Sequence, residues 1–246
     1  MPVLLRLALT EAKLFFREPM TWIFALAVPP LLLIVFGAIP AFREADPALG
    51  GLRVIDLYAP ILVAVGVTIL AVYSLPQQFA GYRERGVLRR MRTTPVRPPA
   101  LLGALLLLFT ALGVCTLALV LVLARLAYGV PLPAAPLAYA SAYLLTVLAL
   151  FSLGLLVAAL APSATSASAV GLVLFFSLAF FGGLWIPRDR MSDVLRAASD
   201  LTPVGAGVQS LQDAAAGGWP SLLSILVLMG WTIVAGGSAA RLFRWE

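Results

Sequence analysis

Residues 98–124 read PPALLGALLLLFTALGVCTLALVLVLA and contain no charged side chain. This stretch exceeds the roughly 20 apolar residues that a helix needs to cross the hydrocarbon core of a membrane. Of the 246 residues, 62% are hydrophobic and 11% are charged, whereas a soluble domain carries about 25% charged residues. Four further charge-free stretches are Pro19–Phe42, Leu57–Tyr82, Leu126–Pro187 and Ala214–Ala240. The chain is therefore predicted to be an integral membrane protein.

The longest charge-free stretch, Leu126–Pro187, is too long for one crossing. A turn is predicted inside it at residues 161–166, where Pro162 lies among small and hydroxyl-bearing residues. Because lipid cannot satisfy open backbone groups, each crossing is expected to be a helix. The predicted fold is an all-α integral membrane protein with six transmembrane helices in one domain over residues 1–246. The six spans are predicted at residues 22–39, 58–79, 101–126, 137–160, 167–186 and 220–239.

The basic residues predict how these spans are oriented. With the N-terminus inside, eleven Lys and Arg residues fall in inner segments and five in outer ones, while Arg125 lies near an outer helix end. Lys and Arg accumulate on the cytoplasmic side of membrane proteins, so both termini are expected in the cytoplasm. The predicted location is the plasma or inner membrane of a cell. We interpret the net charge of +6 as a topology signal. Nucleic acid is not an expected partner, because no aromatic platform accompanies the arginines.

The sequence lacks the side chains on which most enzyme sites depend. It has no histidine, one cysteine (Cys115) and one lysine (Lys13). Histidine is the commonest metal ligand and the usual general base. Lys13 has no glycine near it, whereas a phosphate-binding loop needs a Gly-rich turn before its lysine. We therefore expect no catalytic centre, metal site or nucleotide site in this chain, so any ATP and Mg²⁺ would be used by a partner subunit.

The segment before the first span, residues 3–18, is too short to cross and is amphipathic. Polar residues recur at helical spacing on one side, while Leu, Ala and Phe occupy the other. Such a helix rests in the membrane interface. Its charged positions near the first span are Lys13, Arg17 and Glu18. The alternative is a basic flank that only orients the first span.

Two connections are expected to contain helices. On the inner side, residues 82–91 read YRERGVLRRM, and their apolar residues Val87, Leu88 and Met91 share one face of a helix. On the outer side, the apolar spacing after residue 188 predicts short amphipathic helices over residues 188–216. Both connections are therefore predicted to be more ordered than plain loops.

The inner segment YRERGVLRRMRTTPV, residues 82–96, closely resembles the signature of ABC-2 type transporter permeases. The matching positions are Glu84, Gly86, Thr94 and Pro95, with Met91 in place of the usual leucine and Arg89 or Arg90 where many members have an acid. Further similar stretches are Arg17-Glu18-Pro19, Pro29 within the first span, Phe181-Gly182-Gly183 and Leu201-Thr202-Pro203. The resemblance covers nearly the whole chain and is most like the drug-resistance (daunorubicin-type) branch.

This resemblance implies an N-terminal interfacial helix, six spans, a coupling helix over 82–91 and short extracellular helices before the sixth span. It also implies a unit of two permeases, identical or paralogous, with two ABC ATP-binding subunits. The implied cargo is a hydrophobic or amphiphilic drug, lipid or glycan, moved outwards; the residues that bind it are not identified. The positions implied to contact the ATPase are Glu84, Arg85, Gly86, Arg89, Arg90, Thr94 and Pro95.

Two other classes of function remain open. A secondary carrier or channel would transport without an ATPase, but such carriers usually place ionisable groups within their helices, and the predicted spans hold none except Arg125 near one end. A non-transporting membrane assembly protein would use the arginine-rich segment only as a topology anchor. A gene for an ABC ATPase beside the gene for this chain would favour the ATP-driven exporter over both.

The predicted orientation is testable by cysteine labelling. In a Cys115→Ala background, single cysteines at Ser192 and Arg90 are expected to react with an impermeant maleimide from opposite sides of the membrane. The reason is that these residues lie in connections predicted to be outer and inner. Labelling of both positions from the same side would contradict the topology.

Overall fold

The computed structural model describes residues 3–17, 19–87, 90 and 98–242. The helices that form the bundle are α2 (Pro19–Gly37), α3 (Val54–Thr68), α4 (Leu75–Glu84), α6 (Pro98–Tyr128), α7 (Pro136–Leu160), α8 (Ala164–Phe181) and α11 (Leu222–Leu242). Further helices are α1 (Val3–Phe15), α9 (Asp193–Asp200) and α10 (Pro203–Ala215). A π-helix, η3 (Ile69–Ser74), joins α3 to α4, and 3-10 turns occupy Pro40–Phe42, Pro47–Leu49 and Arg188–Arg190. The described part of the chain is thus almost wholly helical.

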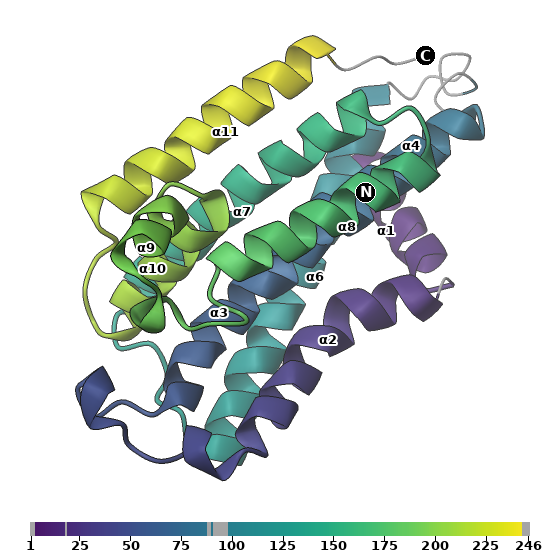
Figure 1. The fold of residues 1–246 in the computed structure, drawn as a ribbon. Coiled ribbons are helices and arrows are strands. Elements are labelled where there is room, and N and C mark those ends of the chain that lie inside the picture. The colour runs from purple at the N-terminus through teal and green to yellow at the C-terminus, as the bar shows by residue number, and fades with distance from the viewer. Residues whose placement is uncertain (1–2, 18, 88–89, 91–97, 243–246) are drawn as a thin grey trace.

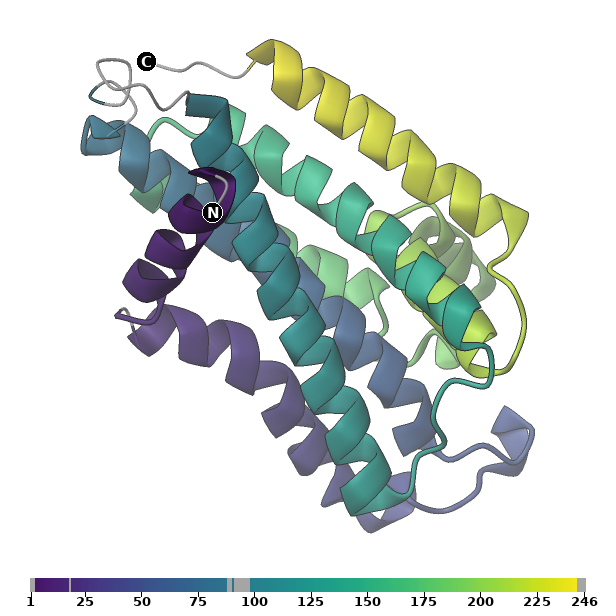
Figure 2. The same cartoon turned by 180° about the vertical axis from the view of Figure 1, so that it is seen from behind.

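The segment α3–η3–α4 runs as one continuous helix through the middle of the bundle (Figure 1). It contacts α2, α6, α7, α8 and α10, and its apolar part is almost entirely buried. On the periphery, α11 packs against α7 and α10, while α1 packs against α6 (Figure 2). The C-terminal ends of α4 and α11 lie at one end of the bundle, called the α4 end; α9 and α10 lie at the other, called the α10 end.

Five helices of the described chain are long and apolar enough to cross a membrane. They are Val54–Glu84, Ala100–Tyr128, Pro136–Leu160, Ala164–Phe181 and Leu222–Leu242. The first predicted span lies in α2, whose apolar part Trp22–Gly37 is shorter than these five. The predicted all-α, multi-pass architecture is confirmed, and the number of six crossings stays a prediction.

The helix limits differ from those predicted where local interactions decide them. The fifth span, expected at residues 167–186, starts at Ala164 because the Ser163 hydroxyl accepts a hydrogen bond from Ser166 N–H at 3.0 Å. It ends at Phe181, shortly before Gly183 adopts a φ of 89°. The second span, expected at residues 58–79, belongs to a helix that continues to Glu84. Charge-free runs therefore locate the spans but not their ends.

The π-helix lies where the central helix touches α7 and α8. The wider turn is seen in the hydrogen bond that Leu75 N–H donates to Leu70 C=O, five residues back. The next residue, Pro76, has no N–H and so donates no backbone hydrogen bond to the preceding turn. The carbonyl groups of Ala71 and Val72 lie against Gly154 of α7 and Gly171 of α8. A methyl group on either glycine would overlap the facing carbonyl oxygen. Glycine is therefore required at both positions for this helix contact.

A buried arginine organises the α10 end. Arg188 is 1% exposed, and its guanidinium donates to the Asp200 carboxylate and to Gly205 C=O. Burial lowers the pKa of Arg188, while the charge and hydrogen bond of Asp200 act in the opposite direction. The segment expected to form short helices, 188–216, contains α9 and α10. Of these, α9 is mostly exposed, whereas α10 is mostly buried against α3, α7 and α11.

The close contact at the π-helix predicts an unequal effect of two glycine substitutions. Gly154→Ala is expected to lower the free energy of unfolding by about 1–3 kcal/mol, because the backbone of η3 must move to admit the methyl group. Gly230→Ala in α11, where no atom lies within 4 Å of the added carbon, serves as the control. Its expected effect is neutral or slightly stabilising because Ala favours helix. Thermal denaturation in detergent measures both variants, and equal melting temperatures would contradict the contact.

Candidate functional site

The residues singled out by the sequence signature lie at the α4 end. Tyr82, Arg83 and Glu84 form the last turn of α4, and Arg85 follows it. The side chains of Glu84 and Arg85 are exposed. Arg89, Thr94 and Pro95 lie outside the described residues, so their predicted roles are not tested. The described signature residues thus sit on the tip of the central helix.

The expected helix over residues 82–91 is not a separate, uninterrupted element. Helix α4 ends at Glu84, and Gly86 adopts a φ of 66°. Gly86 N–H donates to Arg83 C=O at 3.0 Å, the kind of bond that closes a helix with a glycine. Helical hydrogen bonding resumes beyond it, since Arg90 N–H donates to Gly86 C=O at 3.1 Å. Gly86 is therefore a bend between the central helix and the following segment.

The backbone conformation explains why glycine occupies position 86. Beyond Gly86 and its two chain neighbours, no atom of the described residues lies within 4 Å of the place where a Cβ would stand, so contact with the described chain does not require glycine. The positive φ of this residue does require glycine, because a left-handed conformation costs other L-residues about 1–2 kcal/mol. Within this chain, the bend itself is therefore the reason for glycine at this position.

The last turn of α4 is fixed to the N-terminal helix through a buried carboxylate. Tyr82 O–H donates to Glu11 Oε2, and Gln78 Nε2 donates to the Tyr82 hydroxyl at 2.8 Å. Glu11 is 6% exposed, and burial raises its pKa, while the Tyr82 hydrogen bond and the Arg85 charge act in the opposite direction. This arrangement ties α1 to the central helix two residues before Glu84.

Sequence reasoning did not single out Glu11, although a signal for it exists. Ala8, Glu11 and Phe15 share one face of α1, and all three are buried. An acid on the apolar face of an amphipathic helix requires a polar partner. By contrast, Lys13 and Arg17, expected on the polar side, are exposed, and Glu18 lies outside the described residues.

Two further contacts hold the tip of α4. The Arg83 guanidinium donates to Ala161 C=O in the connection between α7 and α8. The Arg85 guanidinium carbon lies 5.4 Å from the Tyr82 ring centroid, a cation–π distance. The aromatic rings of Phe15 in α1 and Phe109 in α6 meet edge to face at 5.8 Å between centroids. The tip is thus attached to α1 and to the connection between α7 and α8, and α1 in turn packs on α6, while Glu84 and Arg85 stay exposed.

A cavity of about 220 Å³ lies beside this tip, lined by Phe15, Ser74, Gln77, Gln78, Gly81, Glu84, Arg85, Phe109 and Ala164. Its walls supply amide, hydroxyl and charged groups, but no pairing of a nucleophile with a base. Within the described ranges, no group of three or more His, Cys, Asp or Glu side chains could hold a metal ion. The arrangement is suited to binding and to transmitting movement.

The Glu11–Tyr82 contact predicts how stability varies with pH. A carboxyl group with a raised pKa binds its proton more tightly in the folded protein than in the unfolded chain. The stabilisation gained by protonation is therefore complete below about pH 4 and is lost as the pH rises through the raised pKa. Glu11→Gln keeps an acceptor for Tyr82 and is expected to flatten this decline.

The control for that measurement is Tyr82→Phe, which keeps Glu11 but removes its donor. A buried carboxylate without its hydrogen bond costs about 1–3 kcal/mol, so this variant should be destabilised at neutral pH. Thermal denaturation between about pH 4 and pH 8 in detergent measures both. Parallel pH profiles for Glu11→Gln and the natural sequence would show that Glu11 does not titrate in this range.

The chain was compared with known protein families and with curated proteins. The sequence model of the family described as ABC-2 type transporter matches residues 3–215. No curated protein matches the chain. The family match includes α1, the tip of α4 and the helices of the α10 end, whereas α11 lies beyond it. The chain therefore belongs to the ABC-2 type transporter family and is a multi-pass membrane permease subunit of an ABC transporter.

Proposed function

We propose that this permease works with a separate ABC ATP-binding subunit and exports a hydrophobic or amphiphilic drug, lipid or glycan. The proposed unit holds two permease chains, identical or paralogous, and two ATPase subunits that use ATP and Mg²⁺. Both termini and the α4 end face the cytoplasm of the cell whose plasma or inner membrane the protein spans. One observation carries the proposal: an exposed, charged tip, Glu84–Arg85, on an otherwise buried central helix.

The central helix is suited to transmit force. Its 31 residues from Val54 to Glu84 correspond to a length of about 45 Å, enough to reach from one membrane face to the other. An ATPase that moves Glu84 on closing would also move α1 and the α7–α8 connection, because Tyr82 and Arg83 are bonded to them. Movement at the tip therefore has a direct mechanical route into the bundle.

A separate ATPase is favoured by what the whole sequence contains. Lys13 is its single lysine and stands in an exposed position of α1 without a Gly-rich loop. The energy for uphill transport would thus come from another polypeptide. Assignment to the drug-resistance branch rests on the resemblance of the signature segment. A secondary carrier would need acidic or basic groups in its spans, and residues 57–82, within the central helix, contain no Asp, Glu, Lys, Arg or His.

The coupling role predicts opposite outcomes for two substitutions at one position. Gly86→Leu is expected to abolish ATP hydrolysis that depends on the permease, because leucine disfavours the positive φ of the bend. Gly86→Asn is expected to keep most of that activity, since Asn accepts left-handed conformations better than other residues. The measurement is ATP hydrolysis by the ATPase subunit with and without reconstituted permease.

Glu84 supplies the second test. Glu84→Ala is expected to reduce co-purification of the ATPase subunit with an affinity-tagged permease, while Glu44→Ala, an exposed acid far along the chain, should not. Abundance in the membrane controls for insertion. Absence of any ABC ATPase from the natural-sequence pull-down, identified by mass spectrometry, would contradict the proposal, as would full ATP hydrolysis in both Glu84→Ala and Gly86→Leu.

A further inference from the structure

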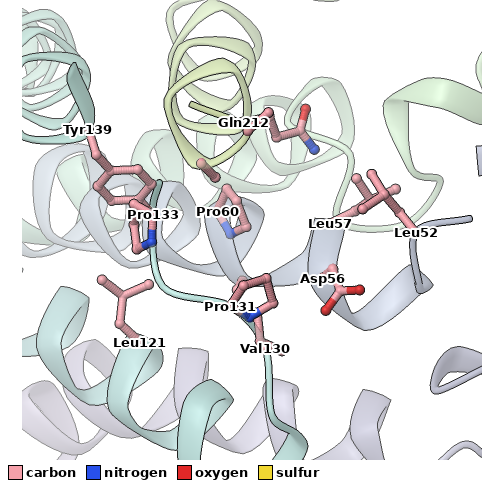
Figure 3. A pocket seen from close by; sticks show the side chains of 13 residues that line it. Leu52, Asp56, Leu57, Pro60, Leu121, Val130, Pro131, Pro133, Tyr139 and Gln212 are labelled. Carbon is pink, nitrogen blue, oxygen red and sulfur yellow. The ribbon is translucent and has the colours of Figure 1, made fainter. Parts of the chain in front are cut away.

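An apolar cavity of about 110 Å³ lies at the α10 end (Figure 3). Four elements form it: α3, α6, α7 and α10, together with the connection between α6 and α7. Its lining residues are Leu52, Asp56, Leu57, Ala59, Pro60, Leu121, Val130, Pro131, Pro133, Tyr139, Gln212, Ala215 and Ala216. Three of these are prolines, so much of the wall cannot donate backbone hydrogen bonds. The cavity is therefore suited to an apolar group.

Two polar groups in this wall lack partners. Tyr139 is 4% exposed, and its hydroxyl has no hydrogen-bond partner within the described part of the protein. The amide nitrogen Nε2 of Gln212 is buried and likewise without a partner there. Figure 3 shows both side chains among the residues around the cavity. A buried donor without an acceptor costs about 1–3 kcal/mol, so two in one cavity wall call for an acceptor supplied from outside the chain.

The third polar group of the wall is already satisfied. Asp56 accepts from Arg53 Nη2 at 2.7 Å and from Arg53 Nε at 3.0 Å. Arg53 Nη1 in turn donates to Tyr128 C=O at 2.9 Å. Because this ion pair is complete, the charge of Asp56 is compensated. The free hydrogen-bonding capacity of the cavity thus belongs to Tyr139 and Gln212, and both can donate.

A second cavity of about 340 Å³ adjoins the first and shares part of its wall. The shared residues are Leu52, Leu57, Gln212 and Ala216. The second cavity also has two carboxylates, Asp189 and Asp213. Asp213 accepts from Gln209 Nε2 at 2.7 Å and takes part in no ion pair among the described residues. Among the described residues that line the two cavities there is no Lys or Arg.

The two cavities together have an ordered chemistry. The apolar chamber contains the Tyr139 hydroxyl, the Gln212 side chain lies in the wall that both cavities share, and the second chamber contains the Asp213 carboxylate. The wall is held in place, because Ala134 N–H and Ala135 N–H donate to Ala215 C=O and Ala214 C=O at 3.2 Å. We propose that this pair of cavities binds a cationic amphiphile, with its apolar group beside Tyr139, an acceptor oxygen at Tyr139 and Gln212, and its cationic group near Asp213.

The same features distinguish this ligand from other candidates. A lipid acyl chain would fill the apolar chamber but would leave both donors without an acceptor. An anionic amphiphile would satisfy the donors but would be repelled by Asp213, whereas Asp189 is paired with Arg196 at 3.9 Å. Water would supply an acceptor for the donors, but it would leave the apolar wall in contact with water. The cationic amphiphile is the class that matches all three parts of the site.

The test is equilibrium binding of tetracaine, an aromatic ester with a protonated tertiary amine, to the purified permease in zwitterionic lipid nanodiscs. Empty nanodiscs measure partition into lipid. Tyr139→Phe and Gln212→Leu are each expected to weaken binding about three- to ten-fold, the loss of one hydrogen bond. Asp213→Asn is expected to weaken it about three-fold and to reduce its dependence on salt. The neutral 3,3-dimethylbutyl ester of the same acid should bind less tightly than tetracaine.

Matched controls come from the chain itself. Tyr143 lies on the same helix as Tyr139, is 7% exposed and also has a hydroxyl without a described partner, but it lines neither cavity. Tyr143→Phe and, for the charge, Asp193→Asn should leave tetracaine binding unchanged. Equal effects of Tyr139→Phe and Tyr143→Phe, or binding no greater than to empty nanodiscs, would overturn the site. No ATPase subunit is present, so failure of this test is distinct from failure of the proposed coupling.

Discussion

The contact between the π-helix and two glycines sets the geometry of the whole bundle. At η3 the backbone of the central helix lies directly against Gly154 of α7 and Gly171 of α8, with no side chain between them. Within a membrane, helices gain little from the hydrophobic effect and associate through close packing and polar contacts. Helix α7 in turn carries α10 and α11. The positions of these outer elements therefore follow from how closely α7 approaches the carbonyl of Ala71.

The same central helix separates two ends with different chemistry. At the α4 end, charged side chains such as Glu84 and Arg85 are exposed, while the anchoring group Glu11 is buried. At the α10 end the buried charged group is Arg188, and the apolar cavity beside Tyr139 lies at the same end. Between the two ends, the side chains of the central helix are mostly apolar and buried against the surrounding helices. A densely packed interior has few ways to deform, so displacement of one end is passed on to the other.

The sequence predicted the large-scale features because they depend on composition. Charge-free runs such as residues 98–124 identify membrane helices without any knowledge of packing, since charge is costly in lipid. The signature residues Glu84 and Gly86 lie at the tip of the central helix, where coupling to an ATPase is proposed. The bend at Gly86 was not foreseen, because a glycine within a helical pattern is compatible with either a bend or a close contact.

Features that depend on partners distant in the sequence were not predicted. Glu11 is buried because of Tyr82, and Tyr139 lines a cavity because Gln212 and Pro131 complete the wall. No pattern of spacing within one segment encodes such pairs. The π-helix escaped prediction for another reason. A wider helical turn leaves the run of apolar residues unchanged, so hydropathy alone does not reveal it.

The burial of Glu11 has a consequence for how the protein is made. Helix α1 is synthesised before its partners, because its buried carboxylate meets Tyr82, 71 residues later, and its Phe15 meets Phe109 later still. Until those segments leave the ribosome, Glu11 has no partner, and its charge keeps that face of α1 in contact with water or lipid headgroups. Helix α1 therefore reaches its final position only after these later segments have been made. Docking of α1 marks the point at which the central helix and α6 are both in place.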